Sequence, residues 1–179
     1  PVFELSGKTL GIVGLGTIGK RVTALAQAFG MKVIALARGN SATEGQIRRL
    51  PRAEFFATAD FVSLHCPLTD ENLGFINQET ITLMKPTAFL INTGRGPLVN
   101  ESDLLAALKS NTIAGAALDV LSIEPPAANH PLITANLPNL FVTPHSAWAS
   151  TESRTRLLDA VCGNIRAFLK GGEIPNRVA

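Results

Sequence analysis

Short apolar runs alternate with helical patterns along the whole chain. The runs have the length and the Val, Ile and Leu content of strands that are buried on both faces of a parallel sheet. They are Thr9–Val13, Lys32–Leu36, Phe61–Leu64, Ala88–Ile91, Ile113–Leu118 and Leu140–Val142. This alternation predicts an α/β fold with a doubly wound parallel sheet, in which ligands bind beyond the carboxyl ends of the strands.

Three helices are predicted from their ends as well as from their composition. Thr17–Phe29 is rich in Ala and Leu and stops at Gly30, a residue typical of helix C-termini. Asn100 can cap Glu101–Lys109, which has acids in its first turn and a lysine in its last. Ser150 can cap a long final helix that ends at Gly171-Gly172 and has apolar residues at helical spacing, namely Leu157, Leu158, Val161, Ile165, Phe168 and Leu169.

The composition suits one folded domain. The chain has 179 residues, of which 46% are hydrophobic and 17% charged, and its net charge is +2. The balanced charge gives no reason to expect nucleic acid or a membrane as the main partner, and no apolar run reaches the ~18 residues of a membrane span. The start of the chain shows no signal-peptide pattern. We therefore expect a soluble, cytoplasmic protein.

The cysteines and histidines form no disulfide framework and no zinc-binding spacing, so no metal site is expected. Cys66 and Cys162 are expected to be small buried apolar residues. His65 is predicted to be structural and His130 to be a loop residue, which leaves His145 as the histidine with a candidate function.

A glycine-rich loop, Gly14-Leu15-Gly16-Thr17-Ile18-Gly19, directly follows the first strand and opens the first helix. Gly14 would allow the tight turn, Gly16 the close approach of a pyrophosphate, and Gly19 the packing of helix against strand. Such a motif alone is weak, because any glycine-rich turn can produce it. Its place between a strand and a helix favours a dinucleotide-binding site over a purely structural turn.

Three of the later apolar runs are followed by an ionisable side chain. Arg95 stands between two glycines after the fourth run, Glu124 follows the fifth, and His145 follows the sixth. Taken singly, Arg95 is compatible with a surface charge, Glu124 with a solvated loop acid and His145 with a turn residue. Together they supply a cation, a carboxylate and a proton donor at one edge of the sheet, which is a complete set for acid–base chemistry.

In these segments the chain resembles the D-isomer-specific 2-hydroxyacid dehydrogenases, particularly their hydroxypyruvate reductase (glycerate dehydrogenase) branch. The resemblance covers nearly the whole chain in one order, through Gly11–Gly19, Val62–Leu68, Ile91–Pro97, Ala117–Pro126 and Thr143–Ser150. It implies a Rossmann-type NAD(P)-binding domain with Arg95, Glu124 and His145 as catalytic residues. It also implies a dinucleotide site lined by Gly14, Gly16, Thr17, Ile18, Gly19, Ala37, Arg38, Cys66, Pro67, Thr93, Gly94, Arg95, Asp119, His145 and Ala147.

The chemistry of these side chains agrees with the implied roles. A guanidinium such as Arg95 can fork onto the carboxylate of a 2-oxoacid and polarise its carbonyl. His145 can protonate the carbonyl oxygen as hydride reaches the carbon, and Glu124 would orient the imidazole and favour its protonated form. Formate dehydrogenases of this fold have glutamine in place of Glu124, so the chain differs from them. Trp148 resembles the tryptophan of hydroxypyruvate and glyoxylate reductases and is predicted to lie near a small substrate, although simple aromatic packing would also explain it.

The end of the second strand departs from the NAD pattern. An acid is expected there to bind the ribose hydroxyls, but the sequence is Ala37-Arg38. Without a repelling acid, and with Arg38, Asn40 and Ser41 as potential phosphate ligands, NADP(H) is expected to be preferred and NAD(H) to be accepted. The alternative is that Arg38 is a solvated loop charge.

The family resemblance also bears on the domain organisation. We expect one dinucleotide-binding domain over residues 1–179, with a core of about residues 7–170 and both ends leading to a substrate lobe whose N-terminal part is absent. This chain is then expected to bind dinucleotide but to reduce 2-oxoacids poorly, and to form a homodimer. A dinucleotide-sensing corepressor of the same fold remains an alternative, because such proteins keep a similar Arg, Glu and His set. A structural oligomerisation domain would leave the glycine loop unexplained.

Overall fold

The computed structural model describes residues 3–38, 43–44, 47–175 and 177. Asn40 and Ser41 lie outside the described residues. The chain divides into two compact units, Pro1–Pro144 and His145–Ala179. The first unit contains the sheet, and the second contains helix α6 (Thr151–Leu169).

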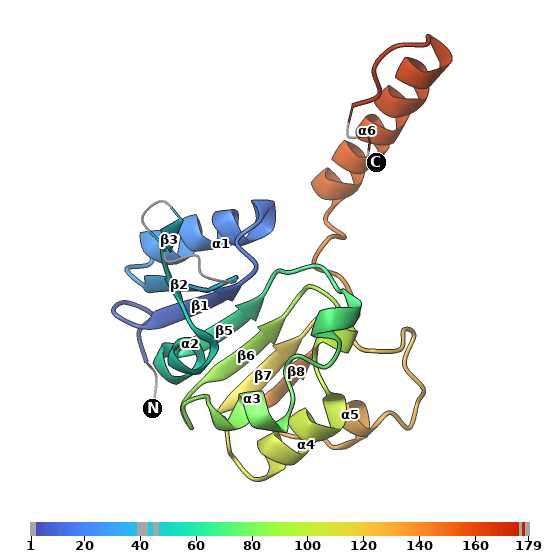
Figure 1. Cartoon of the computed structure of the whole chain (residues 1–179). Helices are drawn as coiled ribbons and strands as arrows, with labels where there is room; N and C mark the ends of the chain where they lie inside the picture. The colour runs from blue at the N-terminus through green and yellow to red at the C-terminus, as the bar shows by residue number, and fades with distance from the viewer. Residues whose placement is uncertain (1–2, 39–42, 45–46, 176, 178–179) are drawn as a thin grey trace. The chain divides into compact units, whose positions relative to one another are not determined.

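The first unit is built on one sheet with the strand order β3-β4-β2-β1-β5-β6-β7-β8 (Figure 1). Seven strands run parallel, and the two-residue β3 pairs antiparallel with β4. The strand order reverses between β1 and β5, which confirms the predicted doubly wound sheet and places its crevice there. The strands are β1 (Thr9–Val13), β2 (Lys32–Leu36), β3 (Thr43–Glu44), β4 (Ile47–Leu50), β5 (Phe61–Leu64), β6 (Phe89–Asn92), β7 (Gly115–Leu118) and β8 (Leu140–Val142).

Helices cover both faces of this sheet. Successive residues of a strand point to opposite faces, and β1 shows what each face contacts. Ile12 packs in a cluster with Ala26 of α1, whereas a Cβ at Gly11 would come within 2.7 Å of the Phe55 ring of α2. The helices of the first unit are α1 (Thr17–Ala28), α2 (Arg52–Thr58), α3 (Gln78–Thr82), α4 (Glu101–Lys109) and α5 (Pro131–Thr134), with 3-10 turns η1 (Asp70–Asn72) and η2 (Gly96–Leu98).

Some element boundaries differ from those expected from the sequence. The strand expected over Ala88–Ile91 is shifted by one residue and includes Asn92, and the strand expected from Ile113 begins at Gly115. The first helix ends at Ala28, with Phe29 as its C-cap. The sequence analysis did not identify β3, β4, α2, α3 or α5, because these elements are only two to seven residues long and show no pattern that repeats along the chain.

The second unit confirms the predicted final helix. The Ser150 hydroxyl accepts a hydrogen bond from the Ser153 N–H at 3.1 Å, and Gly171 follows the helix with φ 67°. The apolar side chains at helical spacing are exposed. Cys162 is also exposed, so the prediction that it is buried is wrong. The reason is that α6 is the one helix among the described residues of this unit, with no second helix or strand there to cover it.

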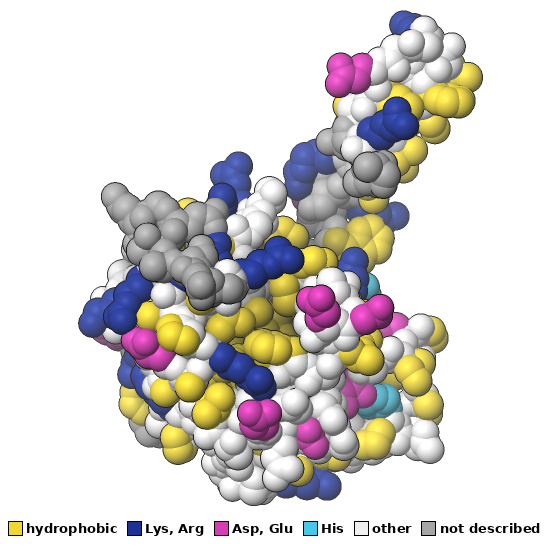
Figure 2. All heavy atoms as spheres, in the orientation of Figure 1, with side chains coloured by type: hydrophobic (Ala, Val, Ile, Leu, Met, Phe, Trp, Pro, Cys, Tyr) yellow, Lys and Arg dark blue, Asp and Glu magenta, His cyan; other side chains and the backbone are white. Residues whose placement is uncertain are grey.

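The surface of the first unit is mixed in charge, with acidic and basic side chains interspersed over the face shown in Figure 2. Within the described part of the chain, no helix combines the length and the apolar character needed to cross a membrane.

Candidate functional site

The glycine loop between β1 and α1 is shaped by the absence of side chains. Gly14 has φ 99°, and a Cβ on it would come within 2.5 Å of the Cys66 backbone nitrogen at the end of β5. A Cβ on Gly19 would come within 2.2 Å of the Gly14 carbonyl oxygen. By contrast, a Cβ on Gly16 would meet no described atom within 4 Å. Two glycines therefore permit internal packing, and the third leaves open space on its outer side.

The N-terminus of α1 suits an anionic ligand at that open space. Gly16 is the N-cap and offers no side-chain cap, so the first N–H groups of the helix stay available. Thr17 and Ile18 in the first turn are exposed. Free N–H groups and the positive end of the helix dipole are favourable to a phosphate. The residues present thus fit the pyrophosphate of a dinucleotide.

The turn that carries Arg95 is held by a buried asparagine. Asn92 is fully buried at the end of β6, where its Oδ1 accepts a hydrogen bond from the Gly94 N–H at 3.0 Å and its Nδ2 donates to the Arg95 carbonyl at 2.9 Å. Arg95 itself is exposed and donates from Nη1 to the Gly94 carbonyl at 2.7 Å. Thr93 is exposed as well. The backbone is therefore fixed while the guanidinium faces outward.

The ends of β6, β7 and β8 are joined in a row. The Asp119 N–H donates to the Asn92 carbonyl at 2.9 Å, and the Thr143 hydroxyl donates to the Asp119 carboxylate at 2.5 Å. Asp119 is only 6% exposed. Its position at the carboxyl edge of the sheet agrees with the predicted place of a dinucleotide ligand, although its role stays a prediction.

The loop that carries Glu124 touches the turn that carries Arg95. Glu124 is exposed, and its Oε1 accepts a hydrogen bond from the Leu121 N–H at 2.8 Å. A Cβ on Gly96 would lie 2.0 Å from the Leu121 carbonyl carbon, so the two backbones are in direct contact. The structure thus brings together the segments of two of the three predicted catalytic residues.

His145 is the first residue of the second unit and has a φ of 51°. Ala147 and Trp148 belong to the same unit, and Trp148 is 53% exposed. Because the two units are described separately, the meeting of His145 with Arg95 and Glu124 stays a prediction.

The residues beyond β2 form the other end of the predicted dinucleotide site. The Ala37 N–H donates to the Leu50 carbonyl at 2.9 Å, which extends the pairing of β2 with β4. Ala37 is half-buried and Arg38 is exposed. The Arg38 side chain is thus accessible at the place where an acid would bind ribose hydroxyls.

His65 and Cys66, which follow β5, are not set up for acid–base or nucleophilic chemistry. Burial lowers the pKa of His65, whose Nε2 lies 2.9 Å from the Ser63 hydroxyl. Burial raises the pKa of the Cys66 thiol and so disfavours the thiolate. The Asn72 side chain donates to the Pro67 carbonyl at 2.8 Å and so closes the turn beyond them. Within the described ranges, no three His, Cys, Asp or Glu side chains converge as a metal site.

Two residues that support this site were not identified from the sequence. Asn92 could have been recognised as a polar residue at the end of an apolar strand. Gly96 could have been recognised only as half of a Gly-Arg-Gly sequence, because its contact with Leu121 depends on the folded chain.

Comparison with known proteins assigns this arrangement to a family. Residues 1–147 match the model of the D-isomer specific 2-hydroxyacid dehydrogenase, NAD binding domain. The chain is 44% identical over 176 residues to the hydroxypyruvate reductase of Blautia hydrogenotrophica, which covers 97% of this chain and 54% of that protein. It is 43% identical over 171 residues to the glycerate dehydrogenase of Methylorubrum extorquens, and this match covers 96% of this chain and 53% of that protein. The chain therefore spans about half the length of the curated relatives it matches.

Solved structures give the same result. The TT0316 protein from Thermus thermophilus matches with a TM-score of 0.92 and 41% identity, over 100% of this chain and 56% of that one. An acyclic imino acid reductase in complex with NADPH and D-Arg matches with a TM-score of 0.86 and 36% identity, over 97% of this chain and 55% of that one. The NAD-complexed D-isomer specific 2-hydroxyacid dehydrogenase of Lactobacillus delbrueckii ssp. bulgaricus matches with a TM-score of 0.88 and 31% identity, over 100% of this chain and 58% of that one.

Proposed function

Because the chain belongs to the D-isomer-specific 2-hydroxyacid dehydrogenase family, as its NAD-binding domain, we propose that the full-length protein reduces a small 2-oxoacid with a nicotinamide dinucleotide. The observation that carries this proposal is the backbone contact between Gly96 and Leu121, which brings the segments of Arg95 and Glu124 together. A cation and a carboxylate on neighbouring loops at the carboxyl edge of the sheet are what an anionic carbonyl substrate requires.

Each of the three catalytic candidates has a distinct task. Arg95 binds the substrate carboxylate and polarises the adjacent carbonyl. When bound, the reduced nicotinamide supplies the hydride that forms the new C–H bond at C2. The carbonyl electron pair moves onto its oxygen, which takes the proton from the His145 imidazole. Glu124 orients that imidazole and stabilises its charged form.

The proposed substrate class is hydroxypyruvate or glyoxylate. Relatives named hydroxypyruvate reductase and glycerate dehydrogenase support it, as does Trp148, whose large exposed ring would limit the space beside a small substrate. A homodimer formed through this domain is inferred from the family resemblance, and light scattering of the full-length protein tests it. A cytoplasmic location is inferred from the sequence, whose two cysteines form no disulfide framework.

The activity is tested with the full-length protein against a panel of small 2-oxoacids and both reduced coenzymes. The proposal predicts that hydroxypyruvate or glyoxylate is reduced faster than larger 2-oxoacids. Binding of coenzyme without reduction of any 2-oxoacid would contradict it and would favour a dinucleotide-sensing module.

The proposed coenzyme preference is for NADP(H), with NAD(H) also accepted. The accessible Arg38 beyond β2, in place of an acid, supports it. Among the coenzyme-bound neighbours, one is in complex with NADPH and another with NAD. A charge-assisted contact of ~1.5–3 kcal/mol corresponds to roughly 10–150-fold in affinity.

Dissociation constants of NADPH and NADH test this preference. Arg38→Ala is expected to remove the difference between the two coenzymes. Lys32→Ala is the matched control, because it removes a cation at the opposite end of the same strand. Equal binding of both coenzymes by the wild type, or an unchanged ratio in Arg38→Ala, would rule it out.

A further inference from the structure

The segment that carries Glu124 lies on the surface without regular structure. Between β7 and α5, a stretch that the structure describes in full, the chain forms neither helix nor strand, and Ser122, Ile123, Glu124 and Pro125 are exposed. Surface loops of this kind are the parts of a protein that move most easily. A carboxylate that must orient a catalytic group therefore needs a restraint on its loop.

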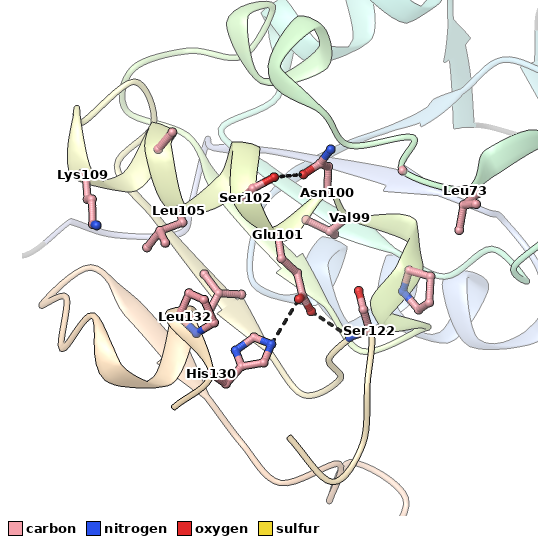
Figure 3. Close-up of a pocket in the computed structure, with 14 residues that line it drawn as sticks. Leu73, Val99, Asn100, Glu101, Ser102, Leu105, Lys109, Ser122, His130 and Leu132 are labelled. Atoms are coloured by element: carbon pink, nitrogen blue, oxygen red, sulfur yellow. Dashed lines mark hydrogen bonds and ion pairs between the residues drawn. The ribbon is translucent and has the colours of Figure 1, made fainter. Parts of the chain in front are cut away.

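Glu101 supplies such a restraint at two points (Figure 3). Its Oε1 accepts a hydrogen bond from the Ser122 N–H at 2.7 Å, and its Oε2 lies 3.2 Å from Nε2 of His130. The Glu101 and His130 side chains are only 20% and 13% exposed. They lie along a hollow of about 780 Å³ whose apolar lining includes Leu73, Val99, Leu105 and Leu132. One carboxylate thus bridges the loop near both of its ends.

The helix that carries Glu101 is well anchored. Glu101 is the first residue of α4, whose N-cap Asn100 accepts a hydrogen bond from the Asp103 N–H at 3.2 Å. Leu104 and Leu108 of the same helix are almost wholly buried. The carboxylate therefore extends from the core of the first unit and not from another mobile segment.

The bridge acts on the peptide next to the one that binds Glu124. Glu101 accepts a hydrogen bond from the N–H of the Leu121–Ser122 peptide, and the N–H of the preceding Val120–Leu121 peptide donates to Glu124 Oε1 at 2.8 Å. On another side the Leu121–Ser122 peptide meets the backbone of Gly96, the residue after Arg95. The Leu121–Ser122 peptide is thus confined by Glu101 and by the Arg95 turn.

We propose that Glu101 is a positioning residue for Glu124: its carboxylate, with His130, fixes the Leu121–Ser122 peptide and thereby aligns the Glu124 carboxylate relative to Arg95. This inference rests on the proposed function, in which Glu124 orients the proton donor. Glu101 touches neither substrate nor coenzyme in this scheme.

The contact itself is tested by hydrogen exchange in the full-length protein, which needs no activity. Glu101→Ala is expected to speed exchange of the Ser122 amide by roughly 10-fold, because it loses a charge-assisted hydrogen bond. Glu101→Gln keeps an acceptor oxygen and is expected to restore much of the protection. Glu79→Ala is the matched control, since Glu79 is also an acid in the first turn of a helix, and its exposed carboxylate lies 3.8 Å from the Arg52 guanidinium and not in the contact with Ser122.

Steady-state kinetics test the consequence for catalysis. Glu101→Ala is expected to lower kcat roughly 10-fold while the substrate KM and coenzyme affinity stay close to wild type, because Arg95 and the glycine loop are unchanged. The solvent deuterium isotope effect on kcat should rise, since proton transfer becomes slower relative to other steps. Glu101→Gln should recover most of the loss.

The outcomes separate this inference from the proposed function. Unchanged Ser122 exchange in Glu101→Ala would overturn the inference, as would faster exchange with an unchanged kcat. A loss of stability with no change in the isotope effect would show a purely structural role and would also overturn it. If the wild-type protein reduces no 2-oxoacid, the proposed function fails, and the catalytic role of Glu101 fails with it, whereas the exchange experiment still reports on the contact.

Discussion

The glycine loop and the two loops that carry Arg95 and Glu124 are fixed by opposite means. In the glycine loop, Gly14 and Gly19 let backbone segments approach one another because no side chain is present. In the other two loops, the side chains of Asn92 and Glu101 reach across to bind backbone groups. A backbone shaped by missing side chains is visible as a motif, and Asn92 is visible as a polar residue at a strand end. The contact of Glu101 with a peptide 21 positions away becomes visible only in the folded chain.

Gly96 allows a close backbone approach next to a loop that side chains hold, and among substitutions in these loops Gly96→Ala should have the largest effect. Gly96→Ala would place a Cβ 2.0 Å from the Leu121 carbonyl carbon, so one backbone must move. We expect a loss of about 1–3 kcal/mol in unfolding free energy. Because the displaced loop carries Glu124, turnover should fall roughly 100-fold. Urea unfolding and kcat measure the two effects, and a variant that equals wild type in both would show that the contact does not align the site.

Substitution of Asn92 tests whether a side chain holds the turn that carries Arg95. Asn92→Ala leaves the Gly94 N–H and the Arg95 carbonyl without their partner in a buried place. The expected loss is about 2 kcal/mol in unfolding free energy, or roughly 30-fold in the folding constant. Asn129→Ala serves as the control, because Asn129 is exposed. Equal effects of the two substitutions would remove the role given to Asn92.

Gly16 tests the glycine loop without disturbing its packing. A Cβ there meets no described atom within 4 Å, so Gly16→Ala should keep its unfolding free energy within about 0.5 kcal/mol of wild type. It should weaken dinucleotide binding about 10-fold, because the pyrophosphate loses its close approach. Gly19→Ala should instead lower stability, since its Cβ would meet the Gly14 carbonyl oxygen. Unaltered coenzyme affinity in Gly16→Ala would contradict the placement of the phosphates.

Much of the fold could be predicted from sequence, because six of its strands are apolar runs and three of its helices have recognisable caps. Strand β4 was missed, since Arg48 and Arg49 interrupt its apolar pattern. In the site, Arg95 and Glu124 were found because they are ionisable residues after buried strands. Glu101 and His130 were not, because their contact joins residues 29 positions apart and depends on how the loop folds back.

Turnover by the full-length His145→Ala variant tests the central claim most directly. If His145 protonates the substrate carbonyl oxygen, kcat for hydroxypyruvate should fall roughly 10²–10⁴-fold, a far larger factor than the change in the dissociation constant of NADPH. A near-normal kcat in this variant would contradict the account.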